Sequence, residues 1–380
     1  MNYIAIFLIG LFILQCGKKE VNNLQISSTN VKISIDPLKA QKFKVEDAIK
    51  DYSYLKLDIP DSLYFSSIEK ILFDDGNIYM LDKSNFQDQI LSFDVEGNFI
   101  FHINKPGRGP GEFESIYDFD VEGNNVLLST PTGLKFYDKT MGTYLKTIPS
   151  SKGLRIQNFK MLDSNLLVTE VGRFKSNTSK KQVKILDLEH DEIIREGVSF
   201  ESHALKGSHS NRYLFNYDDT LSVLPMYDQT VYRVFEDNSG VNIKAAYKLD
   251  FGEYWVNQDL LESSYSDMDA FFKEIGSSIN VFDVFETDQN IYVDYKYSGV
   301  NYAHIYDKEN QTSKNVREFS NNQIGWLGTP VATNGSIIIN TLTAQKILEH
   351  GLNSNYGEFE HFFPSYNEQN VLVLIFVELK

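Results

Sequence analysis

Two kinds of turn recur along this chain, and their spacing constrains the fold more than any other feature of the sequence. The first is a polar turn that opens a short apolar run, at Asn77-Ile78-Tyr79, Asn125-Val126-Leu127, Asn165-Leu166-Leu167, Thr220-Leu221, Asn290-Ile291-Tyr292 and Ser336-Ile337-Ile338. The second places an acid after an apolar residue, at Phe93-Asp94, Tyr137-Asp138, Leu186-Asp187, Phe235-Glu236 and Tyr306-Asp307. Successive turns of either kind are 40 to 71 residues apart, so the two markers advance together.

Six such units predict an all-β fold, a six-bladed β-propeller with four-stranded antiparallel blades. One small twisted sheet cannot bury both of its faces, but six sheets around an axis bury them against their neighbours. The terminal run Asn370–Leu379 is almost wholly apolar, and Tyr52–Ile59 has no unit of its own. We therefore expect the N-terminal strand to close the last blade. The alternative, a two-sheet sandwich with a second domain, does not predict the coupled spacing.

The hexapeptide FDVEGN occurs twice, at Phe93–Asn98 and at Phe119–Asn124. The offset of 26 residues is too short for one blade, which takes about 40 to 50 residues. Asp and Gly in a polar break between apolar runs favour a tight β-turn. We expect the two copies to close two different hairpins.

The composition fits a large packed β-protein and argues against some functions. The chain has 380 residues, of which 42% are hydrophobic and 13% aromatic, so it can bury a sizeable core. The net charge of −16 and the lack of a long Lys/Arg run argue against a nucleic-acid partner. The single cysteine, Cys16, permits no intramolecular disulfide and no cysteine-based zinc site.

The N-terminus reads as an export signal. Ile4 to Leu14 form an unbroken apolar run of 11 residues, too short for a bilayer span and suited to a secretory signal. Cys16 follows directly, and this arrangement resembles a bacterial lipoprotein signal, in which the cysteine is acylated. An ordinary cleaved signal with an incidental cysteine is the alternative. We expect a signal peptide at 1–16, a flexible tether at 17–44, a propeller at 45–380, and a lipid anchor in a bacterial membrane, the outer membrane being favoured.

The stretch Ile90–Phe113 (ILSFDVEGNFIFHINKPGRGPGEF) resembles an NHL-type repeat. More closely, the chain resembles the six-bladed β-propeller lipoproteins of Bacteroidetes. Four stretches carry this resemblance: YSYLKLDI near the start, GRGPGEF at Gly107–Phe113, the run Thr230–Gly252, and the terminal NVLVLIFVELK. The resemblance implies a propeller and exposure at the cell surface, and it implies no agreed activity.

The connections between strands divide into a short set and a long set. Turns between the first and second and between the third and fourth strands of each unit are short throughout. The other connections hold every long insertion, at Glu201–Arg212, Glu253–Ser278 and Asn340–Gln369, the last two with helix-like apolar spacing. Since loops on a rigid scaffold commonly carry function, we expect this insertion-rich face to bind the ligand.

Candidate ligand-binding residues on that face are arginines, aromatics, histidines and one acid. Arg and aromatic side chains suit a carbohydrate or a peptide, through bidentate hydrogen bonds and stacking. The candidates are Arg108, Glu112, Arg173, His209, Arg212, Tyr227 and Trp326, with His203 and Tyr297 as further possibilities. A purely structural pair between Arg108 and Glu112 at an inter-blade corner is the alternative for those two.

No HExxH, P-loop or G-x-S-x-G motif occurs in the sequence. We therefore expect a lipid-anchored binding protein without a cofactor or a metal, whose partner is a carbohydrate, a peptide or an envelope protein. The resemblance to NHL-like propellers leaves an enzyme as the alternative, a metal-dependent lyase or lactone hydrolase with a site in the axial channel. A structural subunit of an envelope assembly is a third hypothesis.

Overall fold

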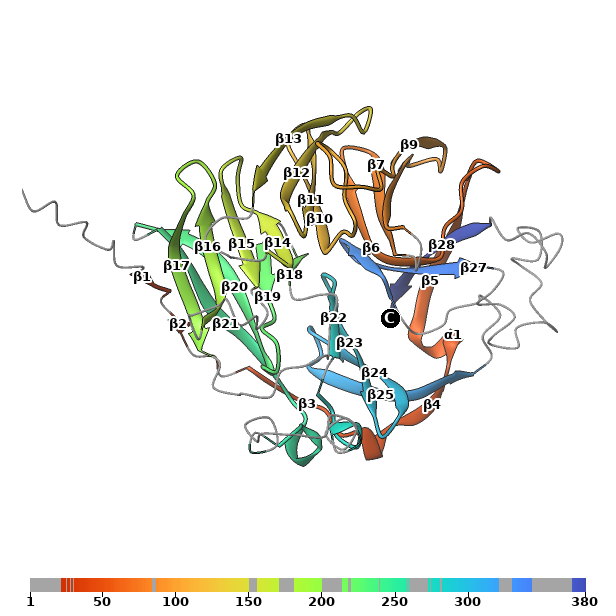
Figure 1. Cartoon of the computed structure of the whole chain (residues 1–380). Helices are drawn as coiled ribbons and strands as arrows, with labels where there is room; N and C mark the ends of the chain where they lie inside the picture. The colour runs from red at the N-terminus through yellow and green to blue at the C-terminus, as the bar shows by residue number, and fades with distance from the viewer. Residues whose placement is uncertain are drawn as a thin grey trace, which may run out of the picture.

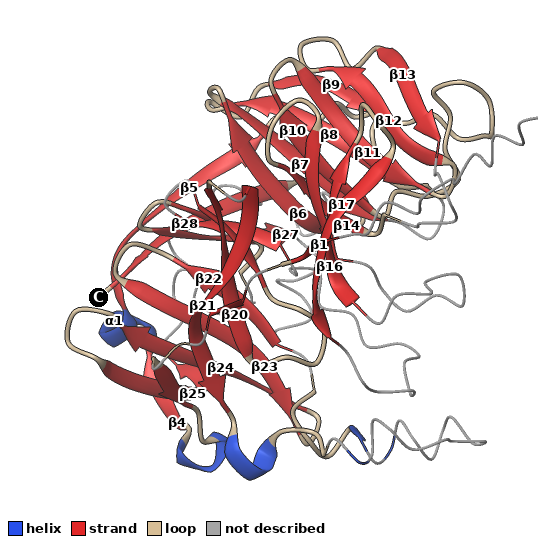
Figure 2. Cartoon of the chain, turned by 90° about the vertical axis from the view of Figure 1, so that its left-hand side faces the viewer, coloured by secondary structure: helices blue, strands red, loops and turns tan. Residues whose placement is uncertain are grey.

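The computed structural model describes residues 22–24, 26–27, 29, 31–83, 87–149, 156–170, 181–199, 214–217, 220–238, 240–257, 259, 273, 275–280, 282–320, 330–343 and 371–380. Their regular secondary structure is almost entirely β-strand, apart from short helical segments such as η1 (Pro37–Lys39), α1 (Val45–Ala48) and η2 (Gly252–Tyr254) (Figure 2). The strands form six sheets around a central axis (Figure 1). The predicted six-bladed β-propeller is confirmed.

Five blades take their four antiparallel strands from one continuous stretch each, in order outward from the axis. Blade 1 contains β6 (Ser67–Asp74), β7 (Asn77–Lys83), β8 (Gln89–Asp94) and β9 (Phe99–Ile103). Blade 2 contains β10 (Asp118–Glu122), β11 (Asn125–Thr130), β12 (Gly133–Asp138) and β13 (Tyr144–Pro149). Blade 3 contains β14 (Asn158–Met161), β15 (Leu166–Glu170), β16 (Lys181–Asp187) and β17 (Glu192–Ser199). Blade 4 contains β18 (Leu214–Tyr217), β19 (Thr220–Val223), β20 (Thr230–Asp237) and β21 (Gly240–Asp250). Blade 5 contains β22 (Phe282–Glu286), β23 (Asn290–Tyr297), β24 (Val300–Asp307) and β25 (Thr312–Ser320).

Blade 6 joins the two ends of the chain. It contains β26 (Ala332–Asn334), β27 (Ile337–Thr343) and β28 (Leu372–Leu379), with β5 (Ile49–Leu57) as its outermost strand. β5 pairs antiparallel with β28, so that Ile375 lies opposite Tyr54. The expectation that the early strand closes the last blade is confirmed.

Six clusters of buried apolar side chains hold the ring together, and each lies between two neighbouring blades. Phe119 of blade 2 packs with Tyr79 of blade 1 in one cluster, and Phe159 of blade 3 packs with Phe136 of blade 2 in the next. The other four join blades 3 and 4, 4 and 5, 5 and 6, and 6 and 1. Each blade thus buries its two faces against two neighbours, which is how a propeller solves the burial problem of a small sheet.

The acidic turn marker has a clear physical role in four blades. Asp94, Asp138, Asp187 and Asp307 each end the third strand, and each Oδ1 accepts a hydrogen bond from a backbone N–H two residues later, at 2.9–3.0 Å. Each carboxylate also accepts a hydrogen bond from a side chain of its own turn. Because these hydrogen bonds stabilise the ionised carboxylate, they lower the pKa of all four carboxyls. The marker recurs in the sequence because the same turn is capped in the same way.

The N-terminal segment differs from its expected role as a tether. In its described part, β1 (Asn22–Asn23) pairs in parallel with β17, β2 (Ile26–Ser27) and β3 (Lys32–Ser34) with β21, and β4 (Gln41–Lys44) with β25. The described residues between 22 and 44, here called the belt, therefore follow the outer rims of blades 3, 4 and 5 in turn. Leu24, Ile33 and Ile35 are at most 5% exposed, because they complete the clusters between those blades. The expectation of a flexible tether is corrected for these residues.

Candidate functional site

A cavity of about 460 Å³ lies at the centre of the ring. The innermost strands of all six blades line it: β6, β10, β14, β18, β22 and β26. Figure 1 shows β6, β10, β14, β18 and β22 around the axis. A volume of this size is within the range of sites for small molecules, about 300–1,000 Å³.

The cavity lies toward the face with the short turns. Its lining includes Asp74, Glu122 and Asn334, which end the first strands of blades 1, 2 and 6 where the chain turns into the second strand. Asn216, Asn334 and Gly335 on this rim are exposed. The insertion-rich face, on which sequence analysis placed the ligand, is at the opposite end of the strands, and most of its long loops are outside the described residues.

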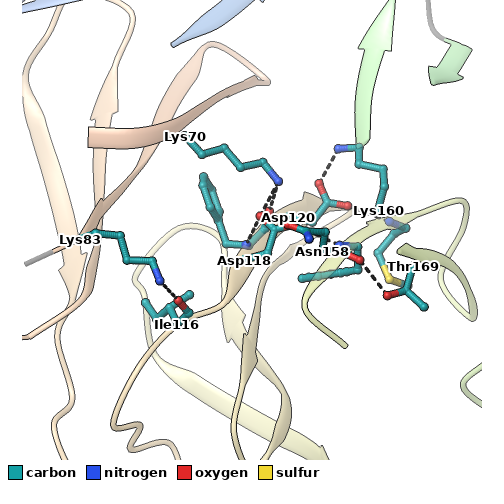
Figure 3. A network of polar contacts seen from close by, with 11 residues as sticks. Lys70, Lys83, Ile116, Asp118, Asp120, Asn158, Lys160 and Thr169 are labelled. Carbon is teal, nitrogen blue, oxygen red and sulfur yellow. Dashed lines mark hydrogen bonds and ion pairs between the residues drawn. The ribbon is translucent and has the colours of Figure 1, made fainter. Parts of the chain in front are cut away.

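On one side of the axis, a charged network joins blades 1, 2 and 3 (Figure 3). Lys70 of blade 1 donates from Nζ to Asp118 Oδ1 and to the carbonyl of Phe119, both at 2.7 Å. Lys160 of blade 3 forms an ion pair with Asp120. Both aspartates lie on β10 of blade 2 and are at most 6% exposed.

The same two carboxylates also serve the innermost strand of blade 3. Asp118 Oδ2 accepts the N–H of Phe159 at 3.0 Å, and Asp120 Oδ2 accepts the N–H of Met161 at 2.8 Å. These N–H groups lie on the inner edge of β14, and on that side β14 has no neighbouring strand in its sheet. An unpaired buried N–H is costly, so these acids stabilise the edge as well as balancing the lysines.

On the opposite side, Glu286 of blade 5 has three partners. Its carboxylate forms ion pairs with Arg233 at 2.6 Å and with Lys308 at 2.8 Å, and it accepts the hydroxyl of Tyr247 at 2.8 Å. Burial and the negative Glu286 raise the pKa of Tyr247 well above its usual value. Lys308 Nζ also lies 3.7 Å from the ring centroid of Tyr217, a cation–π contact at the cavity wall.

Glu122 differs from the other axial acids. Among the described residues its side chain has no hydrogen bond or ion pair, although it is partly buried in the cavity lining. Burial, followed by the charge of Asp120, raises the pKa of Glu122. Its neighbour on the rim, Asp74, is paired with Lys139 at 2.6 Å. The cavity mouth therefore offers a carboxylate that has no hydrogen bond or ion pair among the described residues, and exposed asparagine side chains lie on the same rim.

The axial donor set does not fit a divalent cation. Asp118, Asp120 and Glu286 are each balanced by a lysine or an arginine, so no group of carboxylates is left for a metal. In the part of the chain that the structure describes, no three His, Cys, Asp or Glu residues are placed to hold a metal ion. The residues present thus give no support to the metal-dependent alternative.

Two predicted ligand-binding residues lie in the glycine-rich corner between blades 1 and 2. Arg108 pairs with Glu114, with both Nε and Nη2 at 2.8 Å from Oε1, and is 80% exposed. Glu112 instead accepts the N–H of Gly109 at 2.8 Å. The alternative of an Arg108–Glu112 pair is therefore wrong. The corner packs on the outer half of blade 2, since Tyr137 donates its hydroxyl to the Gly111 carbonyl, and neither Arg108 nor Glu112 lines the axial cavity.

The other predicted residues are only partly covered. Tyr227 lies in a turn that follows β19, with a left-handed φ of +57°. Tyr297 ends β23 and packs edge-on against Tyr254. Arg173, His203, His209, Arg212, Trp326 and Cys16 lie outside the described residues, so their roles stay predictions.

Sequence reasoning missed the axial residues. The one signal that could have found them is the polar content of the predicted innermost strands, such as Asp118-Phe119-Asp120 in an otherwise apolar run. A strand facing a neighbouring blade has no need of two acids unless they meet bases or backbone donors.

No described helix combines the length and the apolar character that crossing a membrane would require. A family model described as "Domain of unknown function (DUF4934)" matches residues 29–378. The matched range includes most of the belt. Among curated proteins, none matches this sequence.

Several solved structures match this chain. A Bacteroides fragilis NCTC 9343 protein named "Putative exported protein" matches with a TM-score of 0.78 and 19% identity, over 92% of this chain and 99% of that one. A chain of the S. cerevisiae Dbp5–Nup159–Gle1 complex matches with a TM-score of 0.40 and 11% identity, over 83% and 77% of the two chains. The WD40 domain of Neurospora crassa Pan2 matches with a TM-score of 0.39 and 10% identity, over 79% and 80%. The first match agrees with the propeller described above.

Proposed function

This chain belongs to the DUF4934 family, and we propose that it is an exported, lipid-anchored envelope protein that binds a polar ligand at the axial cavity. The observation that carries the binding proposal is the cavity itself, which all six blades line and which opens among exposed polar side chains. The apolar run before Cys16 supports export. The name of the B. fragilis protein, which has the same fold over nearly its whole length, agrees with export.

The lining favours binding over catalysis. Its buried acids and bases are committed to one another and to strand edges, so they are balanced before any ligand arrives. Glu122 is the exception, and a carboxylate without a partner accepts hydrogen bonds from hydroxyl, amide or ammonium groups. A short oligosaccharide or a peptide bearing such groups suits this mouth in size and polarity.

The test is a screen of glycans and short peptides against the exported Cys16→Ser chain, by isothermal titration calorimetry. Glu122→Gln should weaken the ligand that emerges by about tenfold, because a hydrogen bond to a charged group is lost. The chain offers a matched control: Glu96 occupies the same position in the other FDVEGN copy, in an exposed turn of blade 1. Glu96→Gln should leave affinity unchanged.

A ligand whose affinity is insensitive to Glu122→Gln would contradict the axial site. The next binding surface to test by mutation would then be the insertion-rich face, beginning with Arg108 and Tyr227, which lie among the described residues. A screen in which no ligand is found at all would argue for the structural-subunit hypothesis.

A further inference from the structure

We propose that the propeller is mounted edge-on at an anionic membrane, with the belt-covered rim of blades 3, 4 and 5 facing the lipid headgroups. This inference rests on the proposed lipid anchor at Cys16. Three independent features of the chain support it: how near to Cys16 the described chain already contacts the ring, how the belt is charged, and which belt side chains are exposed.

The described chain already contacts the ring close to Cys16 in the sequence. Asn22 already lies in register with Arg195 on the rim of blade 3, and the Leu24 N–H donates to the Glu196 carbonyl at 2.8 Å. Leu24 is 5% exposed, and a Cβ on Gly197 would lie 2.7 Å from the Leu24 Cβ, so this contact is close. The chain is therefore held on the ring by residues 22–24.

Chain length then limits how far the ring can stand from the membrane. Cys16 and Asn22 are six residue steps apart, which span at most about 20 Å when fully extended. A free segment from 17 to 44 would have allowed about 100 Å. An acylated Cys16 would keep the blade 3 rim within this short distance of the bilayer.

The segment next to the anchor is basic in an acidic protein. Residues 17–44 hold six lysines and two acids, a net charge of +4, whereas the whole chain carries −16. Lys32, Lys39 and Lys42 keep 58–80% of their side-chain surface exposed even though each has an acidic neighbour. Exposed pairs of this kind are weak, so these ammonium groups remain available to anionic headgroups.

The belt also exposes apolar side chains. Ile26 is 47% exposed, Val31 50% and Leu38 71%, and the first two lie on the blade 4 rim. Lysines interspersed with exposed apolar side chains are typical of a surface that rests at a lipid interface. With the belt-covered rim against the bilayer, the propeller axis runs parallel to the membrane plane. Both ends of the axial cavity then open parallel to the membrane surface.

The experiment uses the acylated full chain on vesicles that contain phosphatidylglycerol. The chain has one cysteine, Cys16, and acylation blocks its thiol. A cysteine introduced elsewhere is therefore the single site for a thiol-reactive label. Asn238→Cys in the outer turn of blade 4 and Glu96→Cys in the equivalent turn of blade 1, across the ring, form a matched pair of exposed positions. Each is labelled with a fluorophore, and the vesicles carry a headgroup-attached quencher.

We expect the label at 238 to be quenched several times more strongly than the label at 96. Inserting twenty Gly/Ser residues after Gly17 should remove most of that difference while leaving the chain bound. Equal quenching in the native, membrane-bound chain would overturn the mounting and leave the anchor intact. A chain that stays in the supernatant would overturn the anchor, and the mounting with it.

Discussion

Asp94 and Asp120 occupy the same place in the two copies of FDVEGN and do different work. Asp94 accepts the N–H groups of Glu96 and Asn98 within its own exposed turn. Asp120 is 0% exposed and accepts from a neighbouring blade, at Met161 N and Lys160. The hexapeptide predicts a turn in both places, but whether its acid serves that turn depends on whether the strand lies at the axis or further out.

We expect Asp120→Ala to lower the free energy of unfolding by about 3 kcal/mol, because it leaves a buried ammonium and a strand-edge N–H without their partner. Asp94→Ala should cost less, since water can replace the lost acceptor. Chemical denaturation of the two variants makes the comparison. Equal losses would show that the axial network adds nothing beyond an ordinary turn cap.

Glu170 should make stability depend on pH. It ends β15, is 1% exposed, and has the Asn158 amide 3.5 Å away; burial raises its pKa to about 7. Because the folded pKa lies above the unfolded one, this carboxyl favours folding below about pH 4.5, and the benefit is lost as pH rises to about 7. Glu170→Gln should therefore be more stable than the native chain at pH 7, by about 2–3 kcal/mol, and similar to it at pH 4. Parallel stability curves from pH 4 to 8 would contradict this.

At the scale of elements, the sequence was informative where a strand repeats and uninformative where it occurs once. The blade strands carry apolar runs between turns of fixed chemistry, so their number and order could be predicted. The belt strands are two to four residues long, and one side of each faces solvent. Their pairing depends on backbone hydrogen bonds to strands 173 to 276 residues away in the sequence, and composition does not record such bonds.

The belt should contribute through a few inserted side chains. Ile33→Ala should cost about 2–4 kcal/mol of unfolding free energy, because Ile33 is 2% exposed within the cluster between blades 4 and 5. Val31→Ala, two residues earlier and 50% exposed, is the matched control and should cost less than about 0.5 kcal/mol. Denaturant titration distinguishes the two, and equal values would mean that the belt is held by its backbone alone.

At the scale of the molecule, ring closure could be predicted because each end of the chain had an unpaired strand. The axial site could not, since it is assembled from six strands that are each only a few residues long at the axis. Which polar side chains meet there depends on the stagger between blades, and turn spacing does not determine that stagger.

Two truncations separate the belt from ring closure. A chain lacking residues 1–44 should still fold, with a lower melting temperature, because blade 6 keeps β5. A chain lacking 1–57 leaves the apolar strand β28 with an open edge, and it should aggregate or lose its single cooperative transition. Calorimetry with light scattering reports both outcomes. Similar behaviour of the two truncated chains would refute a special role for β5.

The pairing of β5 with β28 also determines when blade 6 can form during synthesis. A ribosome makes β5 more than 300 residues before its partner, so blade 6 cannot form until synthesis is nearly finished. Until then β5 has no partner, and the nascent chain can be kept unfolded by chaperones. For a protein that we propose to be exported, this order is favourable, because a translocon passes an open chain more readily than a closed ring.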